Sequence, residues 1–170
     1  KTHLQKQQES YDKQFEELGA ELEIGKITQA EYNKALGELN IKMYAQAKGT
    51  GDKEVLESQY FQNLKTAAEK AIRNQDKNAA LVEFEKVQKD YNTKVREAQA
   101  QQAKGLISQK ELNSNIVSLS VEAAKSAAGI KGIGDEADVF ISVMQLNAKI
   151  LASPIKIKPR DETFDYKKTK

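Results

Sequence analysis

Apolar residues recur at alternating spacings of three and four along almost the whole chain, and no proline interrupts them before Pro154. This spacing places the apolar side chains on one stripe of an α-helix. A proline would break such a helix, because it lacks the backbone N–H. The pattern therefore predicts an all-α chain of long amphipathic helices. The six predicted stripes are Leu4, Tyr11, Phe15, Leu18 and Leu22; Tyr32, Leu36, Leu39 and Met43; Leu56, Tyr60, Leu64, Ala68, Ala71 and Ile72; Phe84, Val87, Tyr91, Val95 and Ala98; Leu112, Ile116, Leu119 and Ala123; and Val139, Phe140, Val143, Leu146 and Ile150.

The composition excludes several classes of protein. The 170 residues include no cysteine, which excludes a disulfide scaffold and any cysteine-based zinc, redox or nucleophile site. No apolar run approaches the roughly 18 residues that a membrane span needs. The net charge of +2 gives no case for nucleic acid or an anionic membrane as the main partner. The start at Lys1, without a visible signal peptide, suggests a fragment or a processed product.

The first break between stripes has the residues of a helix end followed by a helix start. Gly25 suits the left-handed position that closes a helix. Thr28 and Glu31 have the spacing of a capping box, in which each side chain accepts a hydrogen bond from the other residue's backbone N–H. Ile27 is placed to pack on Tyr32 as a hydrophobic staple. Other predicted breaks lie at residues 48–52, 74–78 and 129–134, with Asp135 as the cap of the last helix.

The same pattern recurs 80 residues later without a gap, which predicts two copies of an approximately 80-residue helical unit. The third helix of each copy matches more weakly, through Tyr60 and Phe140 and through Ala68 and Ala148. We predict a first unit at residues 1–80, a second at 81–152 and an extended basic tail or linker at 153–170. The main matching pairs are Tyr11 and Tyr91, Glu17 and Glu97, Gly25 and Gly105, Thr28 and Ser108, Glu31 and Glu111, Leu39 and Leu119, Ala47 and Ala127, and Gly49 and Gly129.

No combination of residues in the sequence predicts catalysis, a metal site or a cofactor. His3 is the single histidine and lies where a chain end frays. The glycines of residues 129–134 follow a helix in the reverse order of a dinucleotide fingerprint, so we interpret the segment as a connector. The acidic pairs at residues 16–17 and 135–136 are expected to be solvated. The tyrosines are expected to fill helix seams with their hydroxyls at the edge. We therefore predict that the protein is not an enzyme.

The phrases Gly-Lys-Ile-Thr-Gln-Ala-Glu-Tyr-Asn at residues 25–33 and Gly-Leu-Ile-Ser-Gln-Lys-Glu-Leu-Asn at residues 105–113 resemble the helix breaks of bacteriophage tail tape-measure proteins. The resemblance implies a structural virion protein inside the phage tail that sets tube length, is ejected with the genome and has no catalytic residues. Before assembly such a protein would be in the bacterial host cytoplasm. The alternative is a helical interaction module, such as an adaptor, a chaperone or a coiled-coil spacer in a bacterial envelope or secretion assembly.

The expected partners are proteins, namely further copies of the chain and other virion or tail proteins, with no specific nucleic acid and no membrane span. The stripes allow either end-to-end helices in a coiled coil or antiparallel hairpins. In the tail, residues 153–160 alternate apolar and basic side chains between two prolines, as in a solvated linker or a strand added to a partner. The residues predicted to mediate self-association are Tyr11, Phe15, Leu36, Leu39, Tyr91, Val95, Ile116 and Leu119.

Overall fold

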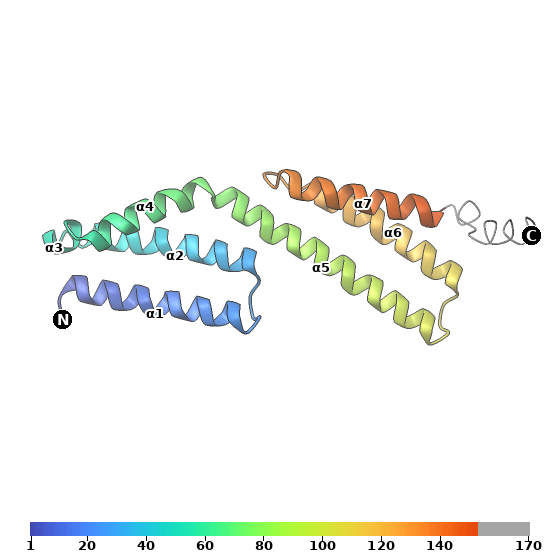
Figure 1. Cartoon of the computed structure of the whole chain (residues 1–170), viewed down its shortest axis with the longest axis horizontal. Helices are drawn as coiled ribbons and strands as arrows, with labels where there is room; N and C mark the ends of the chain where they lie inside the picture. Colours follow the sequence, from blue (N-terminus) through green and yellow to red (C-terminus); the bar gives the residue numbers. More distant parts are fainter. Residues whose placement is uncertain (153–170) are drawn as a thin grey trace, which may run out of the picture. The chain divides into compact units, whose positions relative to one another are not determined.

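The computed structural model describes residues 1–152, and every regular element within them is an α-helix (Figure 1). The prediction of an all-α chain is confirmed for this part of the sequence. The tail predicted at residues 153–170 lies outside the described residues. The helices are α1 (His3–Glu23), α2 (Gln29–Gly49), α3 (Lys53–Leu56), α4 (Gln59–Arg73), α5 (Gln75–Ala103), α6 (Gln109–Ala128) and α7 (Asp135–Ala152).

The chain divides into two compact units, the first at Lys1–Glu83 and the second beginning at Phe84. The division falls inside α5, a few residues beyond the boundary that we predicted between residues 80 and 81. The first unit therefore contains α1 to α4 and the start of α5. The second contains the rest of α5 together with α6 and α7.

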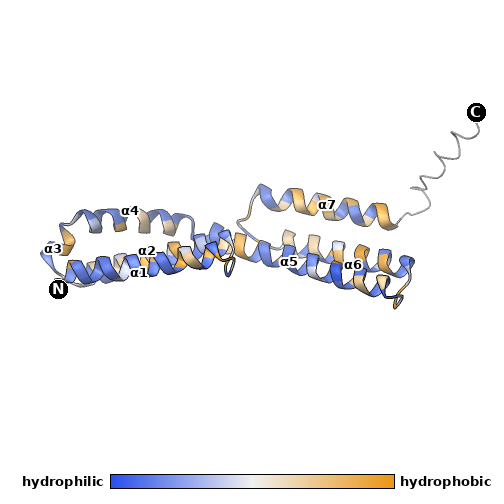
Figure 2. Ribbon diagram, turned by 60° about the horizontal axis from the view of Figure 1, so that its bottom comes forward, coloured by the Kyte–Doolittle hydropathy of each residue, from blue (hydrophilic) through white to orange (hydrophobic). Residues whose placement is uncertain are grey.

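In the first unit, α1 folds back on α2, and α2 packs against α4 (Figure 1). The short helix α3 contacts all three of these helices. Because each helix carries only a narrow apolar stripe, the ribbon alternates between blue and orange along α1, α2 and α4 (Figure 2). The stripes meet in one core, whose buried members are Leu39, Met43, Ala47, Val55, Phe61 and Leu64.

In the second unit, α6 and α7 form the most closely packed pair of helices. The residues that these two helices bury are mainly alanines, and small side chains let two helix backbones approach each other. Val87 and Tyr91 of α5 and Phe140 and Ile141 of α7 pack around this contact. The buried cluster at its centre consists of Ala123, Ala124 and Met144.

Two predicted stripes differ from the observed seams. In the third predicted stripe, Leu56 belongs to α3, because Ser58 caps a new helix, α4. Ile72, in the same predicted stripe, is 57% exposed. In the last predicted stripe, only Phe140 packs against the core of the second unit. Helix α7 is apolar on two sides, so spacing alone does not decide which side is buried. The side with small residues packs on the alanines of α6, and its buried residues are Ala137, Met144 and Ala148.

Two predicted helix boundaries differ from the observed ones. The break predicted at residues 74–78 is confined to Asn74, because α5 begins at Gln75 and the Asn78 N–H donates to the Asn74 carbonyl at 2.9 Å. Asp135 was expected before the last helix but is its first residue. An acidic residue inside the first turn interacts favourably with the helix dipole, as it does at the cap, which explains the ambiguity.

Candidate functional site

The loop between α1 and α2 and the loop between α5 and α6 have matching hydrogen bonds. Gly25 and Gly105 have φ angles of 76° and 75°, in the left-handed region that favours glycine. The next residue in each loop, Lys26 or Leu106, donates its N–H to a carbonyl of the last helical turn at 2.9 Å. The two helix ends are therefore both closed by the Schellman arrangement.

The helix starts that follow these loops carry the same capping box. The Thr28 hydroxyl accepts from the Glu31 N–H at 3.1 Å, and the Glu31 carboxylate accepts from the Thr28 N–H at 2.9 Å. Ser108 and Glu111 make both bonds at 3.0 Å. The hydrogen bonds from the Ser108 backbone and side chain hold the pKa of Glu111 below its usual value. The side chains of these residues accept hydrogen bonds from backbone N–H groups at the starts of α2 and α6.

Replacing either capping residue should destabilise the chain. We expect Thr28→Ala and Ser108→Ala each to lower the free energy of unfolding by about 1 kcal/mol, because a backbone N–H loses its acceptor. Urea denaturation followed by circular dichroism measures the change. Thr93→Ala, at an exposed position within α5, is the control, with an expected change below about 0.5 kcal/mol. Equal stability of all three variants and the wild type would contradict the capping role.

The residues predicted to mediate self-association mostly pack inside their own units. Leu39 is buried in the first core, where Tyr11 and Leu36 pack against it, and Tyr91 packs against the core of the second unit. Val95, Ile116 and Leu119 are half-buried. Phe15 alone of the eight counts as exposed, at 42%. Their apolar surface is therefore used largely for folding, and self-association through them remains a prediction.

Two clusters of three residues stand 80 positions apart and make equivalent contacts. In the first cluster, the Tyr11 hydroxyl donates to Asn40 Oδ1 at 2.7 Å, and the Tyr11 ring meets the Tyr60 ring edge-on, with centroids 6.3 Å apart. In the second cluster, the Tyr91 and Ser120 hydroxyls are hydrogen-bonded at 3.2 Å. The Tyr91 ring meets the Phe140 ring edge-on, with centroids 6.4 Å apart.

The polar members of the two clusters are held by hydrogen bonds. Asn40 and Ser120 are both buried, and a buried polar group without a partner would be costly. The Tyr60 hydroxyl donates to the Gln7 carbonyl at 3.2 Å. Burial, reinforced by the charges of Tyr32 and Asp12, raises the pKa of Tyr11. Burial, reinforced by the charges of Tyr11 and Asp12, raises the pKa of Tyr60 to about 12. A phenol with a raised pKa stays protonated and is a poor general base.

The raised pKa of Tyr60 predicts a late step in an alkaline titration. The folded state favours the neutral Tyr60 phenol over the tyrosinate. The resulting contribution to folding stability is therefore complete below the ordinary tyrosine pKa of about 10. It is lost as the pH rises through about 12. We expect tyrosinate absorbance to rise in two stages, with the later stage accompanied by loss of helix. Tyr60→Phe should remove the contribution of Tyr60 to the later stage of the absorbance rise. A single titration of all tyrosines near pH 10 would contradict this assignment.

The contact between His3 and Asp52 could not be predicted from the sequence. His3 Nδ1 lies 2.8 Å from Asp52 Oδ2, which joins the start of α1 to the cap of α3. Asp52 also accepts from the Glu54 N–H at 2.9 Å, and its pKa is lowered mainly by the hydrogen bond to His3. The two residues are 49 positions apart, and nothing local in the sequence indicated the pairing. Among the described residues, no group of three or more acidic or histidine side chains could hold a metal ion.

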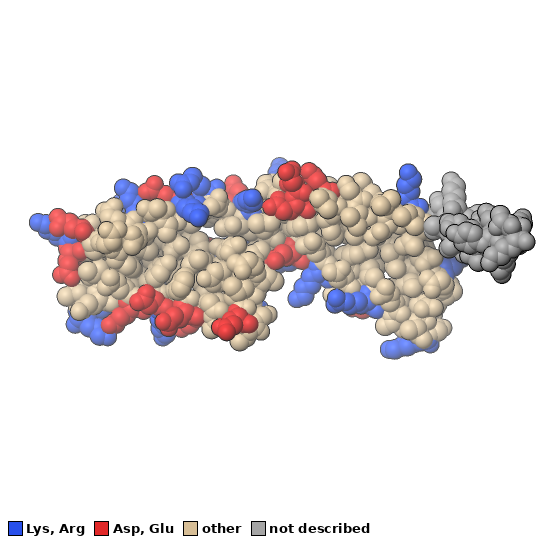
Figure 3. Space-filling view, in the orientation of Figure 1, with Lys and Arg blue, Asp and Glu red and all other residues tan. Residues whose placement is uncertain are grey.

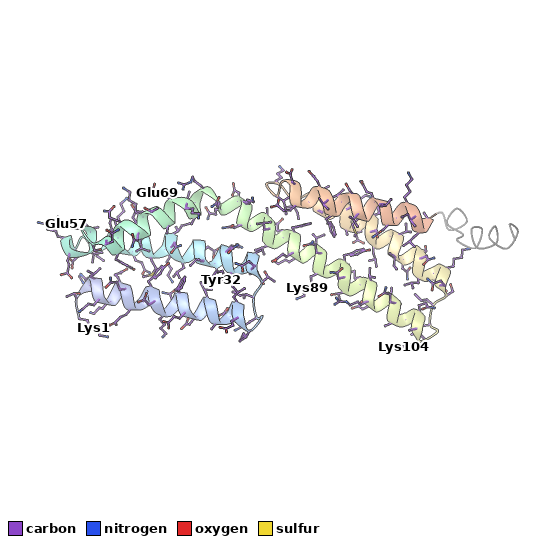
Figure 4. The ribbon with its side chains drawn as sticks, viewed as in Figure 1. Lys1, Tyr32, Glu57, Glu69, Lys89 and Lys104 are labelled. Carbon is purple, nitrogen blue, oxygen red and sulfur yellow. The ribbon has the colours of Figure 1, made fainter. Side chains whose placement is uncertain are left out.

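The surface of each unit carries both signs of charge. On the face shown in Figure 3, Lys and Arg side chains occur beside Asp and Glu on both units. Exposed charged residues such as Glu69 and Lys89 project from the helices in Figure 4. No helix between residues 1 and 152 has the length and apolar character needed to cross a bilayer.

Comparison with protein-family models, with curated proteins and with solved structures finds no match to the chain. The functional interpretation therefore depends on the residues and contacts described above.

Proposed function

We propose that this chain is a structural, non-enzymatic protein made of two copies of one unit of about 80 residues. Each copy has three long helices, namely α1, α2 and α4 in the first and α5, α6 and α7 in the second. The observation that carries the proposal is the correspondence between the two clusters, Tyr11 with Asn40 and Tyr60, and Tyr91 with Ser120 and Phe140. The hydrogen-bond partners of the two tyrosines are chemically different, Asn40 in one case and Ser120 in the other. In both clusters, however, the tyrosine hydroxyl is hydrogen-bonded and the ring meets its neighbour edge-on at a similar distance. Matching helix ends at Gly25 and Gly105 support the same proposal.

A non-enzymatic role is supported by how the polar groups are used. The hydroxyls and carboxylates singled out above cap helices or satisfy buried partners. A catalytic site needs a nucleophile or base aimed at a space where a substrate can bind. The grooves between helices are instead open, such as the one between α5 and α6 that Lys86, Asp90 and Glu122 line.

Among structural roles, we propose a segment of a bacteriophage tail tape-measure protein, working inside the virion after assembly in the bacterial host cytoplasm. The support is the resemblance of residues 25–33 and 105–113 to the helix breaks of that family. A folded unit built on helices of about 20 residues spans roughly 30 Å, whereas 80 residues in one continuous helix would span roughly 120 Å. In this proposal, self-association and other tail proteins supply the partners.

The second candidate is a helical interaction module such as an adaptor, a chaperone or an envelope spacer. The specific observation in its favour is that α1 folds back on α2 and α6 packs closely with α7. Folded-back hairpins leave helix faces exposed, and an amphipathic helix of a partner can dock between such faces. Length measurement by continuous end-to-end helices would not need such hairpins.

Excision of one unit from the parent gene separates the two candidates. Removing residues 25–104 joins Ile24 to Gly105 and leaves α1, α6 and α7 with one intact break. If the chain measures tail length, virions made with this gene have shorter tails, by roughly 30 Å for folded units and roughly 120 Å for extended ones. Electron microscopy of the virions measures the difference. Tails of unchanged length would contradict the tape-measure role and favour the interaction module.

A further inference from the structure

Helix α7 exposes a second apolar stripe on the side that does not enter the core. Its members, which we call the outer stripe, are Val139, Val143, Leu146 and Ile150, with exposed fractions of 68%, 45%, 55% and 42%. Their spacings of four, three and four are those of a coiled-coil seam. Orange segments run along α7 in Figure 2. Exposed apolar stripes on helices are typical of interaction surfaces.

The corresponding helix of the first unit has no such stripe. The residues of α4 that lie 80 positions earlier are all polar and exposed. They are Gln59, Asn63, Thr66 and Lys70. The inner sides of the two helices correspond, however, because Leu64 and Met144 are both buried, as are Ala68 and Ala148. This comparison rests on the proposed repeat, and it shows that the apolar outer stripe is a property of the second unit alone.

The charges at the two ends of α7 indicate what covers the stripe. The first turn carries three exposed acidic residues, Asp135, Glu136 and Asp138, whereas the last turn carries Lys149. Two α7 helices side by side in opposite directions bring the acidic start of each beside the basic end of the other. Parallel packing would place the two acidic ends together, and the helix dipoles also favour the antiparallel arrangement.

We propose that the outer stripe is an interface between two copies of this chain, with their α7 helices antiparallel about a twofold axis. Val139 of each copy then lies opposite Ile150 of the other, and Val143 lies opposite Leu146. The same patch on both copies forms the contact, as a closed dimer requires. This inference gives the proposed self-association a surface different from the residues predicted from the sequence.

The first test replaces the outer stripe with the residues that occupy the same positions in α4. The variant carries Val139→Gln, Val143→Asn, Leu146→Thr and Ile150→Lys in the full chain. Analytical ultracentrifugation should show a dimer for the wild type and at least about a tenfold larger dissociation constant for the variant. Asn63→Ala in α4 is the control and should leave the dimer unchanged. Circular dichroism establishes that the variant keeps its helices. A monomeric wild type, or a dimer that the four changes leave intact, would overturn the proposal.

The second test determines the direction of packing and uses the absence of native cysteine. A mixture of chains carrying Val139→Cys with chains carrying Ile150→Cys should form a mixed disulfide. Neither variant alone should form one, because the two copies of either position lie about 16 Å apart in the antiparallel dimer, beyond the reach of a disulfide. Cross-linking of Val139→Cys with itself would overturn the antiparallel arrangement. The excision test on tail length does not depend on this result, so the two proposals can fail separately.

Discussion

Replacing Met43 with alanine is expected to lower the free energy of unfolding of the first unit by about 2–5 kcal/mol. The Met43 side chain is completely buried at the centre of the core that α2, α3 and α4 share, where Leu39 and Val55 are also buried. The change removes this side chain and leaves a cavity that the surrounding helices fill only in part. Chemical denaturation measures the total loss.

Hydrogen exchange locates the effect of Met43→Ala. We expect amides of α2 and α4 to lose protection, while those of α6 and α7 keep it, since the core of the second unit is a separate one. Leu106→Ala is the control, because that side chain is 70% exposed and contributes little to packing. Equal loss of protection in both units would contradict the assignment of Met43 to a core that belongs to the first unit alone.

The second large effect is expected in the other unit, where Phe84→Ala should cost about 3–5 kcal/mol. Phe84 is 6% exposed, and its ring meets the ring of Phe140 edge-on with centroids 5.4 Å apart. Removing it takes away both the buried area and the aromatic contact between α5 and α7. Denaturation again gives the magnitude, and hydrogen exchange should now show the loss in α6 and α7.

Phe15→Ala is the matched control for this change, because Phe15 is 42% exposed at the edge of the first unit. Its ring stacks beside Tyr11 at 6.0 Å but leaves much of its surface in water. We expect a clearly smaller loss of stability. If Phe15→Ala destabilised the chain as much as Phe84→Ala, the contact between Phe84 and Phe140 would not hold the second unit together as described.

The ends of the helices could be predicted from the sequence because the interactions that form them are local. The capping box of Thr28 and Glu31 spans four residues, and the closing bond from Lys26 to Glu21 spans six. A glycine in the left-handed region, followed by a capping threonine or serine, therefore indicated these turns directly. The 80-residue correspondence then located the second set at Gly105 and Ser108.

Interactions between distant residues could not be predicted in the same way. Periodicity located the apolar residues of α7 but did not show that Met144 and Ala148 would be buried and Val139 exposed. That choice depends on the alanines of α6, which lie in another helix. The pairing of His3 with Asp52 and the acceptor for the Tyr11 hydroxyl likewise depend on how the helices fold back.

The central claim is that one three-helix arrangement occurs twice in the chain, and nuclear magnetic resonance of the full chain tests it most directly. Through-space transfer between selectively labelled aromatic rings reports on pairs that lie as close as those in the two clusters. We predict cross-peaks between Tyr11 and Tyr60 and also between Tyr91 and Phe140, at similar intensities. A cross-peak for one pair in a fully folded chain, with none for the other, would contradict the claim.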